Sequence, residues 1–243
     1  MRRVRILDVP VDRVDGGGAV ARVRELLESP QHEQVILLSM ESFARARRDP
    51  EYSRAVRQAA LVVSVTRRLE HAARMLRHPE VRSVVPFDLI IRILDAAESA
   101  GSSVYLLGGR KEQLERAEKN LRASFPKLRL VGRHAGFYAP RVEQDIITAI
   151  RKSAPRVLLV GSGVPGGELW PLRRRRQLTP GISVWVADCF EVFAGARRPV
   201  PRGVYEAGLE SYSGWITHPW RLLRVFRDLW FWVAVLVHRF RRR

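Results

Sequence analysis

Cysteine is almost absent from the sequence, because Cys189 is the single cysteine among 243 residues. One cysteine cannot form an internal disulfide or a cysteine-based zinc site, so we expect a small buried thiol. His71 and His78 lie seven residues apart on a helical pattern, with no third ligand near them in the sequence. The sequence therefore predicts no metal site and no cofactor.

Long apolar runs are also missing. The longest extends over residues 229–237, far short of the ~20 residues that a helix needs to cross a bilayer. The N-terminal segment MRRVRILDVP is basic but has no apolar run long enough for a signal peptide. We therefore expect a cytoplasmic protein that contacts a membrane only from its surface.

Acidic residues are few, with 25 Asp and Glu against 43 Lys and Arg, for a net charge of +18. Such a chain attracts polyanions, which include nucleic acids, anionic lipids and phosphorylated substrates. The sequence has neither zinc-finger spacing nor an aromatic RNA-binding motif, and its tryptophan-rich C-terminal run is atypical of a nucleic-acid surface. These absences argue against nucleic acid as the partner.

What the chain does contain is an alternation of short apolar segments and helical patterns. The apolar content of 46% is that of a globular protein. Strands are predicted at residues 35–39, 61–65, 103–109, 128–132, 156–161 and 182–188. Helical patterns follow at residues 40–60, 66–78, 85–101, 111–125 and 142–153. Strands that are apolar throughout and alternate with helices predict an α/β, Rossmann-like fold, with a mostly parallel sheet and helices on both faces.

Two glycine-rich segments, LLGGRKE and LLVGSGVPGGE, follow predicted strands. Ligands of such sheets bind beyond the carboxyl ends of the strands, and exposed backbone N–H groups there suit phosphate. Any tight strand-to-helix turn also favours glycine, so each segment alone is ambiguous. Glu168 follows the second turn at a predicted helix start, where it favours the helix dipole whatever its function. The candidate ligand-binding residues are Gly108, Gly109, Gly161, Gly163, Pro165 and Glu168.

The composition changes at Ala196, which predicts an α/β domain over residues 1–195 and a basic helical appendage over residues 196–243. From Trp215 onward there are seven arginines and one acid, and four of the six tryptophans. Arginine beside aromatic bulk is typical of an element that binds anionic lipid headgroups. The alternative is a terminal helix packed on its own domain. The candidates for diphosphate or membrane contact are Arg221, Arg224, Arg227, Trp230 and Trp232.

Six segments, in order, resemble the WecG/TagA/CpsF family of bacterial glycosyltransferases, from about Val35 to Arg224. They are PFDLIIRIL, SVYLLGG, VGRHAGFY, VLLVGSGVPGGELW, VWVADCFEVFAG and GLESYSGWITHPWRLLR. The resemblance implies a nucleotide-sugar donor, typically UDP-N-acetylmannosamine, bound by residues 1–195, with Glu191 and Gly195 added to the donor site. It also implies a polyprenyl-diphosphate-linked acceptor, and a basic appendage that meets an anionic membrane surface. We therefore expect the protein to lie peripherally on the inner face of the plasma membrane.

The family's proposed catalytic Asp is missing. Its Asp-Gly pair falls on Val65 and Thr66, or on Thr66 and Arg67 with a small shift. The family's Asn becomes Glu41, and its Gln in the proline turn becomes Gly167. Further departures are Glu191 for Asp, Pro199–Pro201 for Arg-Ala-Pro, GLES for Gly-Leu-Glu-Trp, Gly214 for Arg, and His218 for Glu.

Three acids are candidates to replace the lost base: Glu41, Asp88 and Glu191. A carboxylate at a strand or helix end is more often a solvated or capping residue than a catalytic one. His134 is either a pocket residue or a packed loop histidine, and self-association beside the appendage is compatible with the sequence. Two functions remain open. The first is transfer of a hexosamine-type sugar in cell-surface polysaccharide synthesis, and the second is an inactive relative that acts as a binding or scaffolding subunit.

Overall fold

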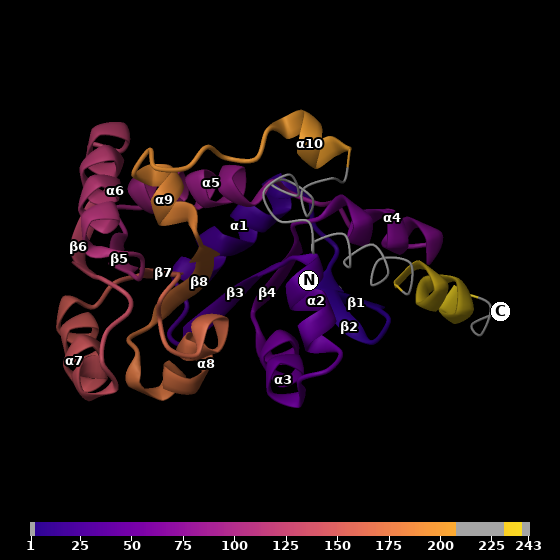
Figure 1. The fold of residues 1–243 in the computed structure, drawn as a ribbon, viewed down its shortest axis with the longest axis horizontal. Coiled ribbons are helices and arrows are strands. Elements are labelled where there is room, and N and C mark those ends of the chain that lie inside the picture. Colours follow the sequence, from indigo (N-terminus) through magenta and orange to yellow (C-terminus); the bar gives the residue numbers. More distant parts are fainter. Residues whose placement is uncertain (1–2, 208–230, 240–243) are drawn as a thin grey trace.

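The computed structural model describes residues 3–207 and 231–239 (Figure 1). Arg221, Arg224, Arg227 and Trp230 lie outside the described residues, so their expected roles stay predictions. In the described part of the chain, a six-stranded parallel sheet has the order β4-β3-β8-β7-β5-β6. The predicted α/β, Rossmann-like fold is therefore confirmed.

The sheet strands are the apolar segments of the sequence, because a strand covered on both faces buries every side chain. Their bounds are β3 His32–Leu38, β4 Leu61–Ser64, β5 Ser103–Leu107, β6 Arg129–His134, β7 Val157–Gly161 and β8 Gly181–Ala187. Every residue of β4, β5 and β7 is buried. The chain leaves β3 and β8 toward opposite faces of the sheet, because α2 Met40–Ala46 follows β3 on one face and α9 Cys189–Phe193 follows β8 on the other.

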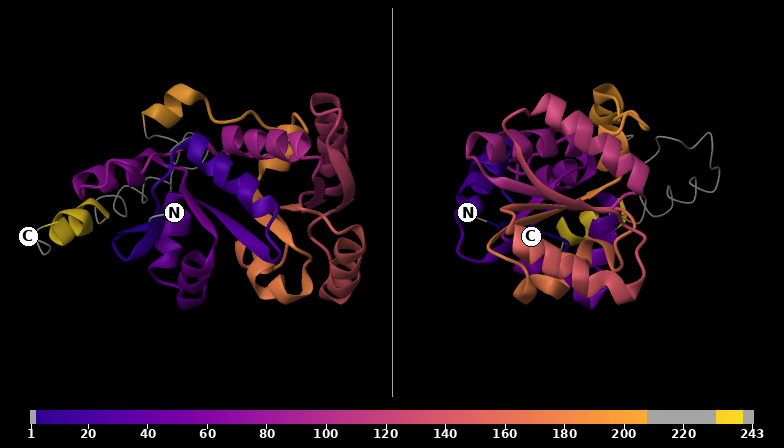
Figure 2. Two further views of the ribbon diagram at one scale, coloured as in Figure 1. Left: turned by 180° about the vertical axis from the view of Figure 1, so that it is seen from behind. Right: turned by 90° about the vertical axis from the view of Figure 1, so that its left-hand side faces the viewer.

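Helices cover both faces of the sheet (Figures 1 and 2). One face packs against α1 Gly16–Leu27, α5 Pro86–Ser99, α6 Lys111–Ser124 and α9 Cys189–Phe193. The other face packs against α2 Met40–Ala46, α3 Pro50–Gln58, α7 Glu143–Ser153 and α8 Trp170–Arg174. Short helices η1 Pro140–Val142, η2 Gly167–Leu169, η3 Arg175–Gln177 and α10 Arg202–Glu206 lie in the connections, and α4 Arg67–Met75 follows β4 at the sheet edge.

The prediction of one continuous helix over residues 40–60 is wrong, because two helices form there. Pro50 lacks the N–H that a continuing helix needs and disfavours helical geometry at Asp49. The Asp49 carboxylate instead accepts hydrogen bonds from the backbone N–H groups of Glu51 and Tyr52, at 2.9 and 3.1 Å. Asp49 is thus the N-cap of α3, with proline in its favoured first position.

An N-terminal hairpin that the sequence patterns did not reveal covers the outer edge of β4. Its strands are β1 Arg3–Ile6 and β2 Val9–Asp12, joined through Leu7 and Asp8 in left-handed backbone conformations. The buried Asp12 carboxylate accepts a hydrogen bond from the Val62 N–H at 2.7 Å and pairs with Arg3 at 2.9 Å. An exposed strand edge invites pairing with other chains, and the hairpin removes this edge from solvent.

Residues 231–239 are helical and pack against the same side of the molecule as α2. Phe231 and Val235 are buried in the cluster formed by α2, α3, α4 and the hairpin. The Phe231 ring meets Phe43 edge to face, with 5.5 Å between centroids. Among the described residues, none of the helices is long and apolar enough to cross a membrane.

Candidate active site

A cleft of about 550 Å³ opens at the carboxyl ends of β3, β4 and β8, where the helices that follow β3 and β8 cover opposite faces of the sheet. Its walls come from α2, the first turns of α5 and α9, the short helix η2, and the segment at residues 197–200, which we call the crossing segment. In open parallel sheets, ligands bind in such a crevice beyond the carboxyl ends of the strands. The position in the fold therefore marks this cleft as the candidate active site.

Three carboxylates line the cleft among the described residues: Glu41, Glu168 and Asp188. Glu41 lies exposed in the first turn of α2, whose N-cap Ser39 accepts a hydrogen bond from the Ser42 N–H at 3.1 Å. Glu168 enters from η2, and Asp188 follows the last residue of β8. The side chains that can move a proton are thus supplied by three separate strand-to-helix turns.

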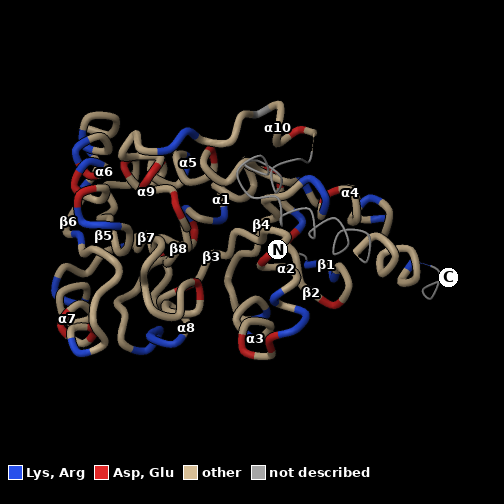
Figure 3. The backbone as a smooth tube through the Cα atoms, viewed as in Figure 1, with Lys and Arg blue, Asp and Glu red and all other residues tan. Residues whose placement is uncertain are grey.

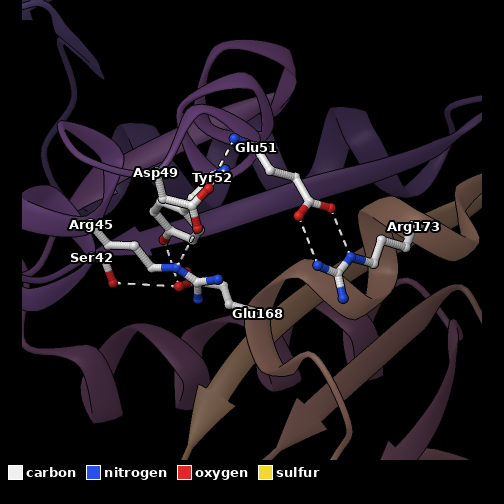
Figure 4. A network of polar contacts seen from close by, with 7 residues as sticks. All are labelled: Ser42, Arg45, Asp49, Glu51, Tyr52, Glu168 and Arg173. Carbon is white, nitrogen blue, oxygen red and sulfur yellow. Dashed lines mark hydrogen bonds and ion pairs between the residues drawn. The ribbon is translucent and has the colours of Figure 1, made fainter.

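Glu168 is enclosed by α2 and α3 (Figure 4). Its Oε2 accepts hydrogen bonds from the hydroxyls of Tyr52 at 2.5 Å and Ser42 at 3.4 Å. Its Oε1 is buried with no partner. Burial raises the pKa of Glu168 to about 7, although the Tyr52 hydrogen bond, Arg45 and Ser42 oppose the rise. Burial, followed by the negative charge of Glu168, also raises the pKa of the Tyr52 hydroxyl, so Tyr52 remains a hydrogen-bond donor.

Three arginines bring positive charge to the same cleft: Arg45, Arg197 and Arg198. Arg45 lies over the Tyr52 ring, 4.7 Å from its centroid, and bonds Asp49 at 3.1 Å. Arg197 donates from Nη1 to Asp188 Oδ2 at 2.8 Å. Guanidinium groups form strong charge-assisted hydrogen bonds to phosphates, so the cleft suits an anionic ligand.

The structure separates the three acids predicted as replacement bases. Glu41 lines the cleft, whereas Asp88 and Glu191 do not. The helix phase explains both exclusions, since successive side chains on a helix point about 100° apart. In α9, Cys189 and Val192 face the cleft, which turns Glu191 away. In α5, Phe87 and Ile90 face it, which turns Asp88 away.

The predicted glycines of the donor site hold the loops beside the cleft in close contact. A side-chain carbon on Gly108 would lie 2.7 Å from the Gly161 backbone, and one on Gly161 would lie 2.6 Å from the Phe190 ring. Gly109 N–H bonds Ser162 O at 2.7 Å, which joins the two glycine-rich loops. Gly163 packs against the Phe137 ring, while Pro165 lies exposed in the turn and Gly195 precedes the crossing segment. Of the described glycines, Gly167 lines the cleft.

Two other predicted side chains have packing partners of their own. His134 bonds Ala135 O through Nδ1 at 2.8 Å and meets the Tyr138 ring edge to face, so it is a packed loop histidine. Trp232 is half-buried against Phe231, with 5.2 Å between ring centroids, and its expected contact with a lipid or diphosphate stays a prediction.

Cys189 is half-buried at the cleft and not fully buried as expected, because α9 turns it toward the opening. Burial, followed by the negative charge of Asp188, raises the pKa of the thiol to about 12. The thiolate is the reactive form of cysteine, so this side chain is unsuited to nucleophilic chemistry near neutral pH.

Sequence reasoning did not single out Asp188, Arg197 or Arg198 as site residues. Asp188 is the last residue of the predicted strand at residues 182–188, and the two arginines fall at the start of the predicted basic appendage. The available signal was position, because Asp188 is a charged residue directly at the carboxyl end of a predicted parallel strand, where ligand-binding residues gather.

The model of the Glycosyl transferase WecG/TagA/CpsF family matches residues 4–243. The chain belongs to this family. It is 25% identical over 150 residues to proteins named N-acetylglucosaminyldiphosphoundecaprenol N-acetyl-beta-D-mannosaminyltransferase from Staphylococcus aureus strains NCTC 8325, COL and N315. The matched region is 62% of this chain and 58% of the length of these relatives. In this WecG/TagA/CpsF family member, the position that the resemblance assigns to the family's Asp is Val65, which lines the cleft, or the buried Thr66.

Proposed function

We propose that this protein transfers an N-acetylhexosamine, of the N-acetylmannosamine type, from a UDP-linked donor to a polyprenyl-diphosphate-linked acceptor. The observation that carries the proposal is the cleft at the carboxyl ends of the sheet strands, lined by both carboxylates and arginines, in a chain that matches the family from residue 4 to 243. The names of the Staphylococcus aureus relatives support the sugar and the acceptor. The product would serve cell-surface polysaccharide synthesis.

The charges of the cleft support group transfer from a nucleoside diphosphate. Cleavage of the bond between the sugar and the diphosphate leaves negative charge on UDP. Arg45 and Arg198 lie where hydrogen bonds could stabilise this charge as it develops. The carboxylates serve the other half of the reaction, because the attacking hydroxyl of the acceptor must lose a proton.

A non-catalytic relative is the second candidate, and one observation favours it. Neither Val65 nor Thr66 can act as a base, so the family's own catalytic group has no replacement at its position. Such a protein would bind the donor or the lipid without turnover and act as a scaffold for the same synthesis.

Binding and turnover of the donor distinguish the two functions. Titration calorimetry of the full chain with UDP and UDP-N-acetylmannosamine measures binding, and release of UDP in the presence of a polyprenyl-diphosphate-N-acetylglucosamine acceptor measures transfer. We expect binding and acceptor-dependent release of UDP. Binding without release would favour the scaffold, and absence of binding would overturn both the transferase and a scaffold that binds the donor.

Peripheral association with the inner face of the plasma membrane is part of the proposal. The helix at residues 231–239 buries Phe231 and Val235 but exposes Val233, Leu236 and Val237. Next to it, an apolar groove between this helix and α2 is bordered by Arg47 and Arg48. Exposed apolar side chains beside arginines are suited to the interface of an anionic bilayer.

A further inference from the structure

The carboxyl end of β8 departs from regular strand geometry. Val160 pairs with Trp185, but the next residue of β7, Gly161, pairs with Ala187, so β8 contains one extra residue. This arrangement is a bulge, a feature that redirects side chains and is common next to active sites. Ala187 also has a left-handed backbone with φ of 45°, a conformation that is strained for a residue other than glycine.

Contacts with the neighbouring loop hold this irregular geometry in place. The Ser162 N–H donates to Ala187 O at 3.0 Å. Gly161 lies so close that a side-chain carbon there would approach Ala187 O to 3.2 Å and the Phe190 ring to 2.6 Å. Backbone strain that the surroundings maintain is concentrated at functional sites. The strain at Ala187 therefore points to the residue that follows it.

That residue is Asp188, whose carboxylate reaches the cleft. Its side chain is 48% exposed, and its Oδ2 accepts the 2.8 Å hydrogen bond from Arg197. Arg197 is itself fixed, because its backbone N–H donates to Glu191 O at 3.1 Å. The crossing segment thus orients a solvent-accessible carboxylate at the edge of the cleft.

The other two carboxylates of the cleft are less suited to take a proton from a bound hydroxyl. One oxygen of Glu168 is occupied by Tyr52 and Ser42, and the other is enclosed, so neither is open to a ligand in this structure. Glu41 lies in the first turn of α2, where a carboxylate favours the helix dipole without any further role. Asp188 is the N-cap residue of the five-residue helix α9, but its side chain makes no capping hydrogen bond and instead pairs with Arg197 at the cleft, next to the strained Ala187.

We propose that Asp188 is the catalytic base of this protein, in place of the Asp that the family carries at the Val65 or Thr66 position. The proposal rests on the transferase function proposed above. Asp188 accepts the proton of the acceptor hydroxyl while the oxygen of that hydroxyl forms a bond to the anomeric carbon of the donor sugar. The bond from that carbon to the β-phosphate oxygen breaks, and its electron pair leaves with UDP. Arg197 is a positioning residue that orients the carboxylate.

The test compares Asp188→Asn with Asp95→Asn, which changes an exposed carboxylate of α5 outside the cleft. The asparagine variant keeps the shape of the side chain and a hydrogen-bonding oxygen, but it is a far weaker base. We expect kcat for acceptor-dependent UDP release to fall by about 10² to 10⁴-fold in Asp188→Asn, with UDP affinity and the thermal unfolding midpoint unchanged. Asp95→Asn should match the wild-type protein.

Two further measurements separate a base from a structural carboxylate. Formate added to Asp188→Ala should restore part of the lost turnover, because a small carboxylate can occupy the vacated space, whereas chloride at equal ionic strength should not. Arg197→Met should lower kcat in the wild-type background but cause little further loss in Asp188→Asn, since the two residues act through one contact.

The outcomes distinguish the two levels of the proposal. If the wild-type protein releases UDP on addition of the acceptor and Asp188→Asn does so at a similar rate, the assignment of the base is wrong while the transferase function stands. Loss of turnover in Glu41→Gln or Glu168→Gln, with turnover retained in Asp188→Asn, would likewise overturn the assignment and leave the transferase function in place. If the wild-type protein binds no UDP and transfers no sugar, the proposed function fails and the assignment of Asp188 fails with it.

Discussion

Glu168 retains its proton up to about neutral pH, because burial raises the pKa of its carboxyl group from 4.5 to about 7. In the unfolded chain the same carboxyl ionises near its ordinary pKa. Between pH about 4.5 and about 7 the native state therefore binds more protons than the unfolded state. The free energy of unfolding should fall as the pH rises through this window, by about 3 kcal/mol in total for this residue.

Urea unfolding at several pH values between 4.5 and 8 tests this expectation in the wild-type protein and Glu168→Gln. The glutamine variant should lack the part of the pH dependence that Glu168 contributes. Tyr52→Phe is a matched variant of opposite effect, because it removes a hydrogen bond that lowers the pKa of Glu168 and should move the window to higher pH. If the free energy of unfolding depended on pH with the same slope in all three proteins, the raised pKa of Glu168 would be contradicted.

The sequence could reveal a site residue only where neighbouring residues in the chain determine the position of its side chain. Glu41 and Glu168 follow strands that end in recognisable turns, so their position near a ligand was predictable. Asp88 and Glu191 were placed at the correct ends of the correct helices, but the helix phase within the first turn decides which side chain faces the cleft. Asp188 depends on a bulge formed with Gly161, far away in the sequence. The end of the predicted strand marks Asp188 as a residue near the site, but no local pattern reveals the bulge that aims its side chain.

At the scale of elements, Glu70 in α4 fixes the connection that leads to the cleft-lining start of α5. Its carboxylate is 1% exposed and accepts hydrogen bonds from the Ser83 N–H at 3.0 Å, the Ser83 hydroxyl at 2.7 Å and Arg67 at 3.0 Å. Burial alone would raise the pKa of Glu70, but the bonds from Ser83 and Arg67 outweigh it and lower the pKa to about 2. Arg74 and Arg82 also pair with this carboxylate, at 2.8 and 3.2 Å.

Replacing Glu70 by Gln should therefore destabilise the protein by about 3 kcal/mol, since arginines around a buried carboxylate lose their counter-charge. Chemical denaturation measures this loss. Glu80→Gln is the matched control, because Glu80 pairs with Arg13 in a more exposed setting and should change stability by less than about 1 kcal/mol. Equal effects of the two substitutions would show that Glu70 is no special anchor.

The fold was predictable wherever the burial of an element can be read from its own residues. Strands such as β5 and β7 are apolar at every position or nearly so, and the helices between them have periodic apolar residues, so the parallel sheet followed from the sequence. The hairpin of β1 and β2 did not follow from the sequence, because four-residue strands with Arg and Asp side chains resemble a polar loop. The tertiary hydrogen bond between Asp12 and the Val62 N–H is what places the hairpin against the sheet. The run of arginines at residues 173–176 is, from the sequence alone, typical of a solvated helix face, but the structure pairs three of them with acids. Their partners are Glu51, Glu143 and Glu33 from three other elements, and Figure 4 shows the two-point contact of Arg173 with Glu51.

For the molecule as a whole, the positive charge is distributed and not confined to one stripe. Lys and Arg occur in both helical layers and toward both ends of the described structure (Figure 3). A net charge of +18 draws the protein toward any anionic surface but does not orient it. Orientation requires an apolar contact, and the exposed side chains Val233, Leu236 and Val237 provide one candidate.

Sedimentation with anionic liposomes tests whether these side chains enter a membrane interface. Deleting the whole appendage is a poor experiment, because it also removes Phe231 and Val235 from the core that they share with Phe43. The double substitution Leu236→Asp and Val237→Asp changes exposed positions only and should release the protein from the liposomes. Gln144→Asp together with Thr148→Asp, at exposed positions of α7, adds the same charge elsewhere and should leave most binding intact.

Because salt screens the arginine contribution but leaves apolar burial unaffected, raising the ionic strength should weaken wild-type binding without abolishing it. Equal loss in both double variants would mean that the protein binds as a bulk cation, without a defined membrane-facing side.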